Sequence, residues 1–271
     1  MPRSVLSTFR SAQDPLGSTT VVYDSIASVA AGSLLVIGWS FEGGFGDPMG
    51  SVADTINGTP SGKTWYVYSF GATRECGVAY CYDHPGGSNV VITGTIANSG
   101  MRVYREGYGA VLSGTVGEIN PRTLAAVTST HATSGATSFA FTMPGDGTLF
   151  ASVTSVASLP GFAATSPATL VNTLSTPTNY GACMVQATTG AGSKTIASTG
   201  GQAALINGIA LAFNDPTVGG PVITGPSGSA GAATSTKTVA ENSTAVHTFT
   251  ADVAVTWSIN GGADAADFDI N

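Results

Sequence analysis

The sequence has few charged residues. Asp, Glu, Lys and Arg make up 9% of its 271 residues, against about 25% in an ordinary soluble domain. The net charge is −7, and no cluster of Lys or Arg occurs, so a nucleic-acid partner is not expected. Solubility must come from Ser, Thr, Asn and Gly, a composition typical of secreted, extracellular and virion proteins.

Long apolar runs are also missing. No stretch of about 18 apolar residues occurs, so we expect no membrane-spanning segment and no membrane partner. Residues 1–17 contain two Arg residues and lack the apolar core of a secretory signal peptide. We therefore expect either assembly in the cytoplasm and release by lysis, as for virion proteins, or export by a C-terminal signal beyond Asn271.

The residues that usually carry chemistry are sparse. The 3 Cys residues are an odd number and do not form a disulfide framework. The 3 His residues lie far from one another, which does not favour a metal site built from His residues. There is no G-x-S-x-G motif and no phosphate-binding loop. We predict that the chain is not an enzyme and has no cofactor.

One short polar run, Asp83-His84, could belong to a catalytic site. It comes directly before Pro85-Gly86-Gly87, and such a sequence is typical of a turn. We interpret it as the polar end of a hairpin.

The chain is rich in short strand-like runs. Its 36 Gly and 13 Pro residues separate about a dozen apolar segments of strand length, such as 33–41 and 203–213. This pattern predicts an all-β fold, an antiparallel, jelly-roll-like β-sandwich.

A faint internal repeat is present. SIASVAAGSLLVIGWSF (25–41) parallels SFAFTMPGDGTLFASVTS (138–155), and GVAYCYDHPGGSNVVITGT (77–95) parallels GACMVQATTGAGSKTIASTG (181–200). The repeated order predicts similar hairpins in two halves. We expect one pseudo-symmetric domain of two sheets, because a half of about 100 residues would leave open sheet edges.

Composition divides the chain into four parts. Residues 1–19 are predicted to be an irregular N-terminal arm and residues 20–213 the β-sandwich body. Residues 214–233 are rich in Pro, Gly and Ser, which predicts a semi-flexible linker. Residues 234–271 alternate apolar and polar residues and predict an incomplete second β-domain.

The aromatic segment 65–70 is the first candidate for ligand binding. On a strand, Trp65 shares one face with Val67, and Tyr66 shares the other with Tyr68 and Phe70. One row should lie in the core. The other row either packs as well, which we favour, or forms a platform on which a sugar stacks. Trp65, Tyr66 and Tyr68 are therefore candidate residues for contact with a glycan or a partner.

The segment before it, residues 42–62, is predicted to be a loop of about 20 residues. Loops of this length are often functional. Its carboxylates Asp47 and Asp54 are further candidates for contact with a glycan or a partner.

The tail carries a resemblance. Ala240-Glu241-Asn242, Ala251-Asp252 and VTWSINGGADAADFDIN (255–271) resemble the cadherin-like, Ig-like repeats of bacterial and phage surface proteins. In that family the matching Glu and Asp residues bind calcium between domains, which makes Glu241 and Asp252 calcium candidates. The family's paired Asp motifs are missing, and we interpret both acids as solvated surface charges.

The body resembles the jelly-roll modules of phage fibres, head decorations and bacterial adhesins. The resemblance rests on Ala31-Gly32-Ser33-Leu34-Leu35-Val36, Lys63-Thr64-Trp65 and Ala210-Leu211-Ala212-Phe213. It implies a structural or adhesive virion protein of a tailed phage, a fibre, spike or decoration subunit. Such a protein would be a homo-oligomer that contacts other virion proteins and a host-surface glycan. The alternatives are a bacterial cell-surface adhesin and a carbohydrate-binding module.

Overall fold

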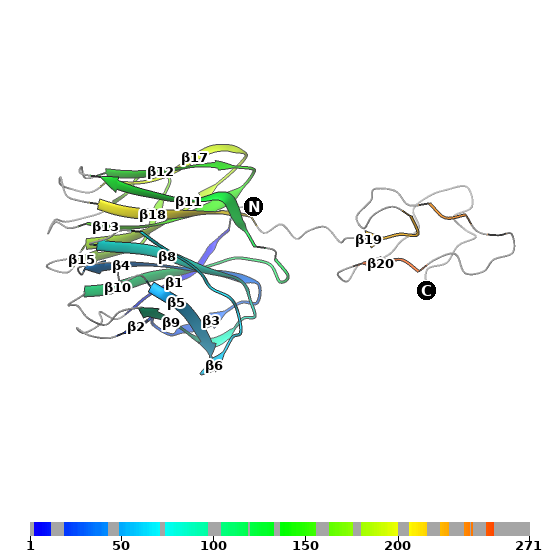
Figure 1. Ribbon diagram of the computed structural model, residues 1–271, viewed down its shortest axis with the longest axis horizontal. Helices are drawn as coiled ribbons and strands as arrows, with labels where there is room; N and C mark the ends of the chain where they lie inside the picture. Colours follow the sequence, from blue (N-terminus) through cyan, green and yellow to red (C-terminus); the bar gives the residue numbers. More distant parts are fainter. Residues whose placement is uncertain are drawn as a thin grey trace. The chain divides into compact units, whose positions relative to one another are not determined.

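The computed structural model is built from β-strands (Figure 1). It describes residues 3–11, 19–42, 49–70, 74–96, 104–118, 120–132, 136–155, 163–175, 180–199, 206–215, 223–227, 236–238, 240 and 248–251. All paired strands in these ranges run antiparallel, which confirms the all-β prediction. The same ranges include no helix that is long and apolar enough to cross a membrane.

The chain divides into two compact units, Met1–Val218 and Gly219–Asn271. The division falls inside the segment 214–233 that composition marks as a linker. In the second unit, β19 (Ile223–Thr224) pairs with β20 (Thr250–Ala251). The strands expected between 253 and 271 lie outside the described residues.

The first half of the body forms two antiparallel sheets, which we number by their place in the stack. Sheet 1 has the order β2 (Thr20–Val22), β9 (Gly87–Ile96), β5 (Met49–Ile56) and β6 (Thr59–Pro60), and β3 (Ile26–Val29) also pairs with β9. Sheet 2 has the order β1 (Val5–Arg10), β10 (Tyr104–Leu112), β4 (Ser33–Glu42), β8 (Arg74–His84) and β7 (Tyr66–Phe70). The strands pair from the outside of the sequence inward, β1 with β10, β3 with β9 and β4 with β8, as in a jelly roll.

The second half repeats this topology. Sheet 3 has the order β11 (Arg122–Ala132), β18 (Ile206–Asn214), β13 (Gly147–Ser155), β16 (Tyr180–Thr188) and β15 (Thr169–Ser175). Sheet 4 has the order β12 (Ala136–Met143), β17 (Gly192–Thr199) and β14 (Ala163–Ala164). Strands β4 and β13 hold matching places in their sheets, as do β8 and β16, so the topology confirms the repeat predicted from the sequence. The predicted hairpins are wrong, because the two strands of each repeated segment lie in different sheets.

The four sheets lie in layers with three apolar cores between them (Figure 1). The first core joins sheets 1 and 2, the second joins sheets 2 and 3, and the third joins sheets 3 and 4. The expected single pair of sheets is therefore replaced by two stacked sandwiches. Each half closes its own core, and the stacking covers one further face of each.

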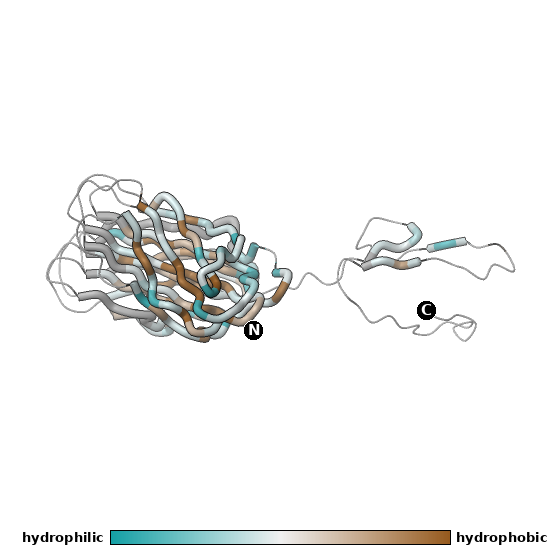
Figure 2. Tube along the Cα trace, turned by 90° about the horizontal axis from the view of Figure 1, so that it is seen from below, coloured by the Kyte–Doolittle hydropathy of each residue, from teal (hydrophilic) through white to brown (hydrophobic). Residues whose placement is uncertain are grey.

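Strands of the two central sheets are apolar on both faces, and in Figure 2 the apolar residues of the body follow its strands. In β4, Leu35 and Ile37 face the first core, whereas Leu34 and Val36 face the second. A continuous apolar run is typical of a strand that is buried on both sides.

Small side chains let the backbones of sheets 2 and 3 approach closely. A Cβ at Gly38 would collide with Cys183 and Ser152 across the contact. Nearby, the Ser40 hydroxyl donates to Thr154 Oγ1 at 2.5 Å. The contact between the halves is therefore tight and partly polar at its centre.

Sheets 2 and 3 face each other in opposite strand order. Strand β7 lies over β18, β4 over β13 and β16, and β10 over β16 and β15. Strand β4 thus faces its equivalent β13, and the contact of β7 with β18 is equivalent to that of β15 with β10. The two halves are therefore related by an approximate two-fold axis, as in an isologous dimer.

Two segments predicted to be irregular contain strands. Within the predicted arm, Val5–Arg10 forms β1, because it pairs with β10 and the Phe9 ring packs over Gly109. Within the predicted loop 42–62, Met49–Ile56 forms β5 and pairs with β9. Its inward row includes Asp54 among apolar residues, and this carboxylate hides the strand pattern in the sequence.

Candidate functional site

Strand β7 and the residue before it separate the aromatic segment into the two rows that the sequence predicts. Trp65 and Val67 pack in the first core. Tyr66, Tyr68 and Phe70 pack against the second core and are half-buried. Both rows therefore contribute to packing, as we favoured, but the tyrosine side keeps part of its surface in solvent.

Trp65 and Asp54 lie inside the first half and bond to one another. Trp65 is 8% exposed and Asp54 is 4% exposed. The indole Nε1 donates to Asp54 Oδ1 at 2.7 Å, and the Ser61 hydroxyl donates to the same oxygen at 2.8 Å. These two candidate residues thus contact each other, and the described structure leaves them little surface for a ligand.

His84 completes this buried network. Its Nδ1 accepts the Gly86 N–H at 3.0 Å, so the ring proton must sit on Nε2, which is 3.0 Å from Asp54 Oδ2. Both ring nitrogens are thereby occupied, and the His84 side chain is fully buried. A general base needs a free nitrogen within reach of a substrate. The geometry of the His84–Asp54 pair therefore fits a role in stabilising the fold.

The hydrogen bonds also set the charge of Asp54. Burial alone raises the pKa of this carboxyl, but hydrogen bonds from His84, Trp65 and Ser61 outweigh burial, and the pKa lies below its ordinary value. Asp54 is therefore a buried carboxylate whose oxygens accept three donors.

A partly exposed ion pair lies next to His84. Lys63 Nζ is 2.9 Å from Asp83 Oδ2, and Asp83 Oδ1 accepts the Gly117 N–H at 2.9 Å. Burial raises the pKa of Asp83, and the bonds to Lys63 and Gly117 more than reverse this effect. The interpretation of Asp83-His84 as a hairpin end is wrong, because β8 lies in sheet 2 and β9 in sheet 1, so the turn between them crosses from one sheet to the other. Asp83 and His84 nevertheless hold this turn in place through hydrogen bonds.

Four tyrosines form what we call the tyrosine row: Tyr66 and Tyr68 on β7 and Tyr80 and Tyr82 on β8. The rings of Tyr66 and Tyr80 stack at 5.0 Å and 14°, those of Tyr66 and Tyr82 at 6.0 Å and 23°, and those of Tyr68 and Tyr80 at 6.5 Å and 6°. Tyr80 is buried, and the other three are half-exposed. Because the rings cover one another's faces, the row offers edges and hydroxyl groups to a ligand.

The hydroxyl groups of the row are already ordered. Tyr80 donates to Asn120 Oδ1 at 2.9 Å. The pKa of Tyr82 is raised, chiefly by its hydrogen bond with Tyr66 and then by burial. Tyrosine hydroxyls that are held in this way suit hydrogen bonding to an uncharged ligand.

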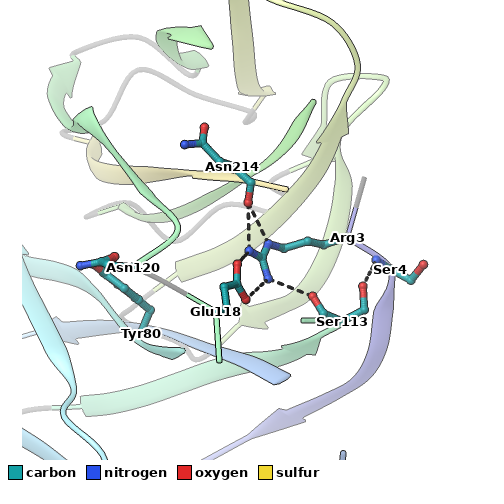
Figure 3. Close-up of polar contacts among 7 residues, drawn as sticks. All are labelled: Arg3, Ser4, Tyr80, Ser113, Glu118, Asn120 and Asn214. Carbon is teal, nitrogen blue, oxygen red and sulfur yellow. Dashed lines mark hydrogen bonds and ion pairs between the residues drawn. The ribbon is translucent and has the colours of Figure 1, made fainter. Parts of the chain in front are cut away.

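A second buried ionic network joins the two halves of the body (Figure 3). The Arg3 guanidinium forms an ion pair with Glu118, and both side chains are almost wholly buried. Arg3 also donates to the Ser113 carbonyl at 3.0 Å and to the Asn214 carbonyl at 2.9 and 3.1 Å. It therefore links the end of the first half, the connection between the halves and the end of β18.

The cysteines and the candidate metal ligands form no site among the described residues. The side chains of Cys76, Cys81 and Cys183 are buried and form no disulfide bond, and burial raises the pKa of Cys81 and Cys183 to about 12. Among the described residues, no group of three His, Cys, Asp or Glu side chains could hold a metal ion. Asp47 and the calcium candidates Glu241 and Asp252 lie outside the described residues.

Taken together, the structure brings Trp65, Asp54 and His84 into one buried cluster and leaves Tyr66 and Tyr68 at the surface. Sequence reasoning did not connect Asp54 with His84, because they are 30 residues apart and meet only when sheets 1 and 2 pack. It also missed Tyr80 and Tyr82 as neighbours of Tyr66, although Tyr80-Cys81-Tyr82 has the spacing that puts both rings on one face.

The comparisons with known proteins give no relative. No family model, no curated protein and no solved structure matches this chain. Its function must therefore be argued from its own residues.

Proposed function

We propose that this chain is a non-enzymatic structural and adhesive protein of a tailed bacteriophage particle, a fibre, spike or decoration subunit. In this proposal the body is a rigid support, and the second unit is a further β-module carried on a linker. The location is the virion, and the partners are other virion proteins and a host-surface glycan.

The observation that carries the adhesive part is the tyrosine row. Its half-exposed members are Tyr66, Tyr68 and Tyr82, the side chains of Tyr66 and Tyr82 share a hydrogen bond, and β8 pairs with β7 along its whole length. Tyrosine supplies a large, rigid and amphipathic contact surface with little loss of side-chain entropy. Sugars present hydroxyl groups and apolar C–H edges, which match the hydroxyls and ring edges of this row.

The structural part is supported by how the charged groups are used. Of the described acids, Asp54 and Glu118 are buried and bonded within the fold, and Asp83 is held by Lys63 and Gly117. These groups stabilise turns and the junction of the halves. A body that uses these charged groups to hold its own fold suits a particle component that must persist outside the cell.

A glycan array probed with the full chain tests the adhesive part. Tyr82→Ala and Tyr66→Ala should each abolish detectable binding, because they remove two neighbouring members of the row. Thr93→Ala, on the outer side of sheet 1, is the matched control and should bind like the unmodified chain. Binding that survives both tyrosine substitutions would refute glycan recognition by this row.

Mass spectrometry of purified phage particles tests the structural part separately. Peptides from the body should occur in intact particles at a fixed ratio to the major capsid protein. Their absence from particles, together with their presence on a bacterial surface, would replace the virion proposal with a cell-surface adhesin.

A further inference from the structure

The sheet edges of the body differ in how well they are protected against pairing with another chain. An open edge strand is a template for an added strand, and proteins blunt such edges with bulges, Pro residues or short strands. Edge strands β1, β11 and β15 each carry a register shift. At the ends of sheets 1 and 4, β2 has 3 residues, β14 has 2, and β6 has 2 and contains Pro60.

Strand β7 has none of these protections. Its pairing with β8 is regular through all 5 residues, from Tyr66 to Phe70. The sequence Tyr-Val-Tyr-Ser-Phe contains no charge and no Pro. Within the described ranges no strand pairs with its outer edge, where the order of sheet 2 ends.

The side chains of β7 are also incompletely covered on both faces of the sheet. Val67 is half-buried against the first core, and Tyr66, Tyr68 and Phe70 are half-buried against the second. An added strand next to β7 would cover both rows at once. Edge strand β12 is also regular, but its exposed row, Ser138, Ala140 and Thr142, offers only small side chains.

We propose that β7 is the contact through which two copies of this chain associate, by antiparallel β7–β7 pairing about a two-fold axis at Tyr68. In this register Tyr68 lies opposite its own copy, and Tyr66 lies opposite Phe70. All pairs on that face are aromatic, and such cross-strand pairs stabilise a sheet. Sheets 2 of the two copies join into one continuous sheet, and the interface is closed and isologous.

Charge at β7 does not oppose a second copy as the occupant. Each chain has a net charge of −7, so identical chains repel unless they meet through a neutral surface. Strand β7 is neutral, and the adjoining Lys63 and Asp83 compensate each other at 2.9 Å. A partner chosen by opposite charge would gain nothing from this strand. The proposal does not depend on the phage assignment or on glycan binding.

A disulfide trap tests the register. Paired residues of antiparallel strands have Cα atoms about 4.5–5.5 Å apart, which lies within the range that a disulfide spans. Tyr68→Cys should therefore form a covalent dimer under mild oxidation. The native cysteines are buried and should not compete. The control Thr8→Cys places an exposed thiol on β1, at the opposite edge of sheet 2, and should remain monomeric on a non-reducing gel.

Light scattering after size-exclusion chromatography tests the association itself. The unmodified full chain should have twice its mass of 27.0 kDa. Ser69→Lys puts a like charge from each copy at the shared edge and should halve the mass, whereas Ser28→Lys, an equally exposed position on β3, should not. Circular dichroism melting establishes that each variant is folded.

The outcomes separate clearly. A folded Ser69→Lys variant that keeps the doubled mass would overturn the proposal, as would an unmodified chain that is monomeric. Equal cross-linking of Tyr68→Cys and Thr8→Cys would also overturn it. Loss of glycan binding in a chain that still dimerises would refute the adhesive function and leave this interface standing.

Discussion

His84 and Thr188 hold matching positions in the two halves of the body. Each ends the strand that pairs with the first residue of the central strand, Ser33 in one half and Gly147 in the other. His84 bonds to a buried carboxylate on sheet 1, whereas the Thr188 hydroxyl donates to the Gly147 carbonyl at 3.1 Å. The same strand order is thus compatible with an ionic network and with a single neutral hydrogen bond.

This comparison separates the apolar residues that determine the fold from the polar groups that differ between the halves. Both halves place apolar side chains on both faces of their central strands, Leu35 and Val36 in β4 and Leu149 and Phe150 in β13. Burial of these side chains is the dominant favourable term, and it is common to both halves. The polar groups at the strand ends differ freely, provided that each is satisfied by a partner.

The largest expected effect comes from the network that joins the halves. Arg3→Met leaves the Glu118 carboxylate buried without its partner, and we expect the free energy of unfolding to fall by about 3–5 kcal/mol. The double variant Arg3→Met/Glu118→Met removes both charges and should recover much of this loss. Urea denaturation measures both, and a single variant within about 1 kcal/mol of the unmodified chain would contradict a structural role for the pair.

The next effect compares the two matching positions. Asp54→Ala leaves the donors of His84, Trp65 and Ser61 without their acceptor, and because an orphaned buried group costs about 1–3 kcal/mol, we expect a loss of about 3 kcal/mol or more. Thr188→Val removes one neutral hydrogen bond and should cost about 1 kcal/mol. Equal losses in urea denaturation would show that the network of the first half adds nothing to a single bond.

Acid should distinguish the halves in a third way. The pKa of Asp54 is lower in the folded chain than in the unfolded chain. The contribution of ionised Asp54 to the free energy of unfolding is therefore complete above the pKa of the unfolded chain, about 3.9. It is lost as the pH falls through the lower pKa of the folded chain. The stability difference between the unmodified chain and Asp54→Asn, measured by urea denaturation, should be constant above about pH 5 and shrink below about pH 4. A constant difference down to the acid limit would contradict an ionised Asp54.

The smallest effect is expected at the surface. The Lys63 and Asp83 side chains are 32% and 26% exposed, so solvent screens their attraction. Lys63→Ala should lower the free energy of unfolding by at most about 1 kcal/mol, and added salt should reduce the difference. A larger, salt-independent loss in thermal melts would indicate that Lys63 supports the turn by packing instead.

Much of the fold follows from the apolar pattern of the sequence. The turn at Pro144-Gly145 and the central strands were predictable, because turn residues and apolar runs are local signals. The number of layers was not predictable. A strand with apolar residues on both faces must be covered on both sides, but its sequence does not identify the sheets that cover it. Strand β5 was missed because Asp54 occupies an inward position. A carboxylate in the sequence indicates a loop unless the buried groups that donate hydrogen bonds to it are known.

The candidate site was predictable only in part. The period of two assigns Trp65 and Tyr66 to opposite faces, and the structure agrees. It does not say which face keeps contact with solvent, because that depends on how far sheet 3 extends over β7. The unprotected edge of β7 is visible only after the strand order is known.

The course of β18 has a mechanical consequence. Strand β18 is paired on both sides, with β11 and with β13, and the chain leaves it at Asn214, whose carbonyl Arg3 holds. A pull directed along the axis of β18 would load both ladders of backbone bonds in shear. Such a load on β18 would be shared between two strand pairings.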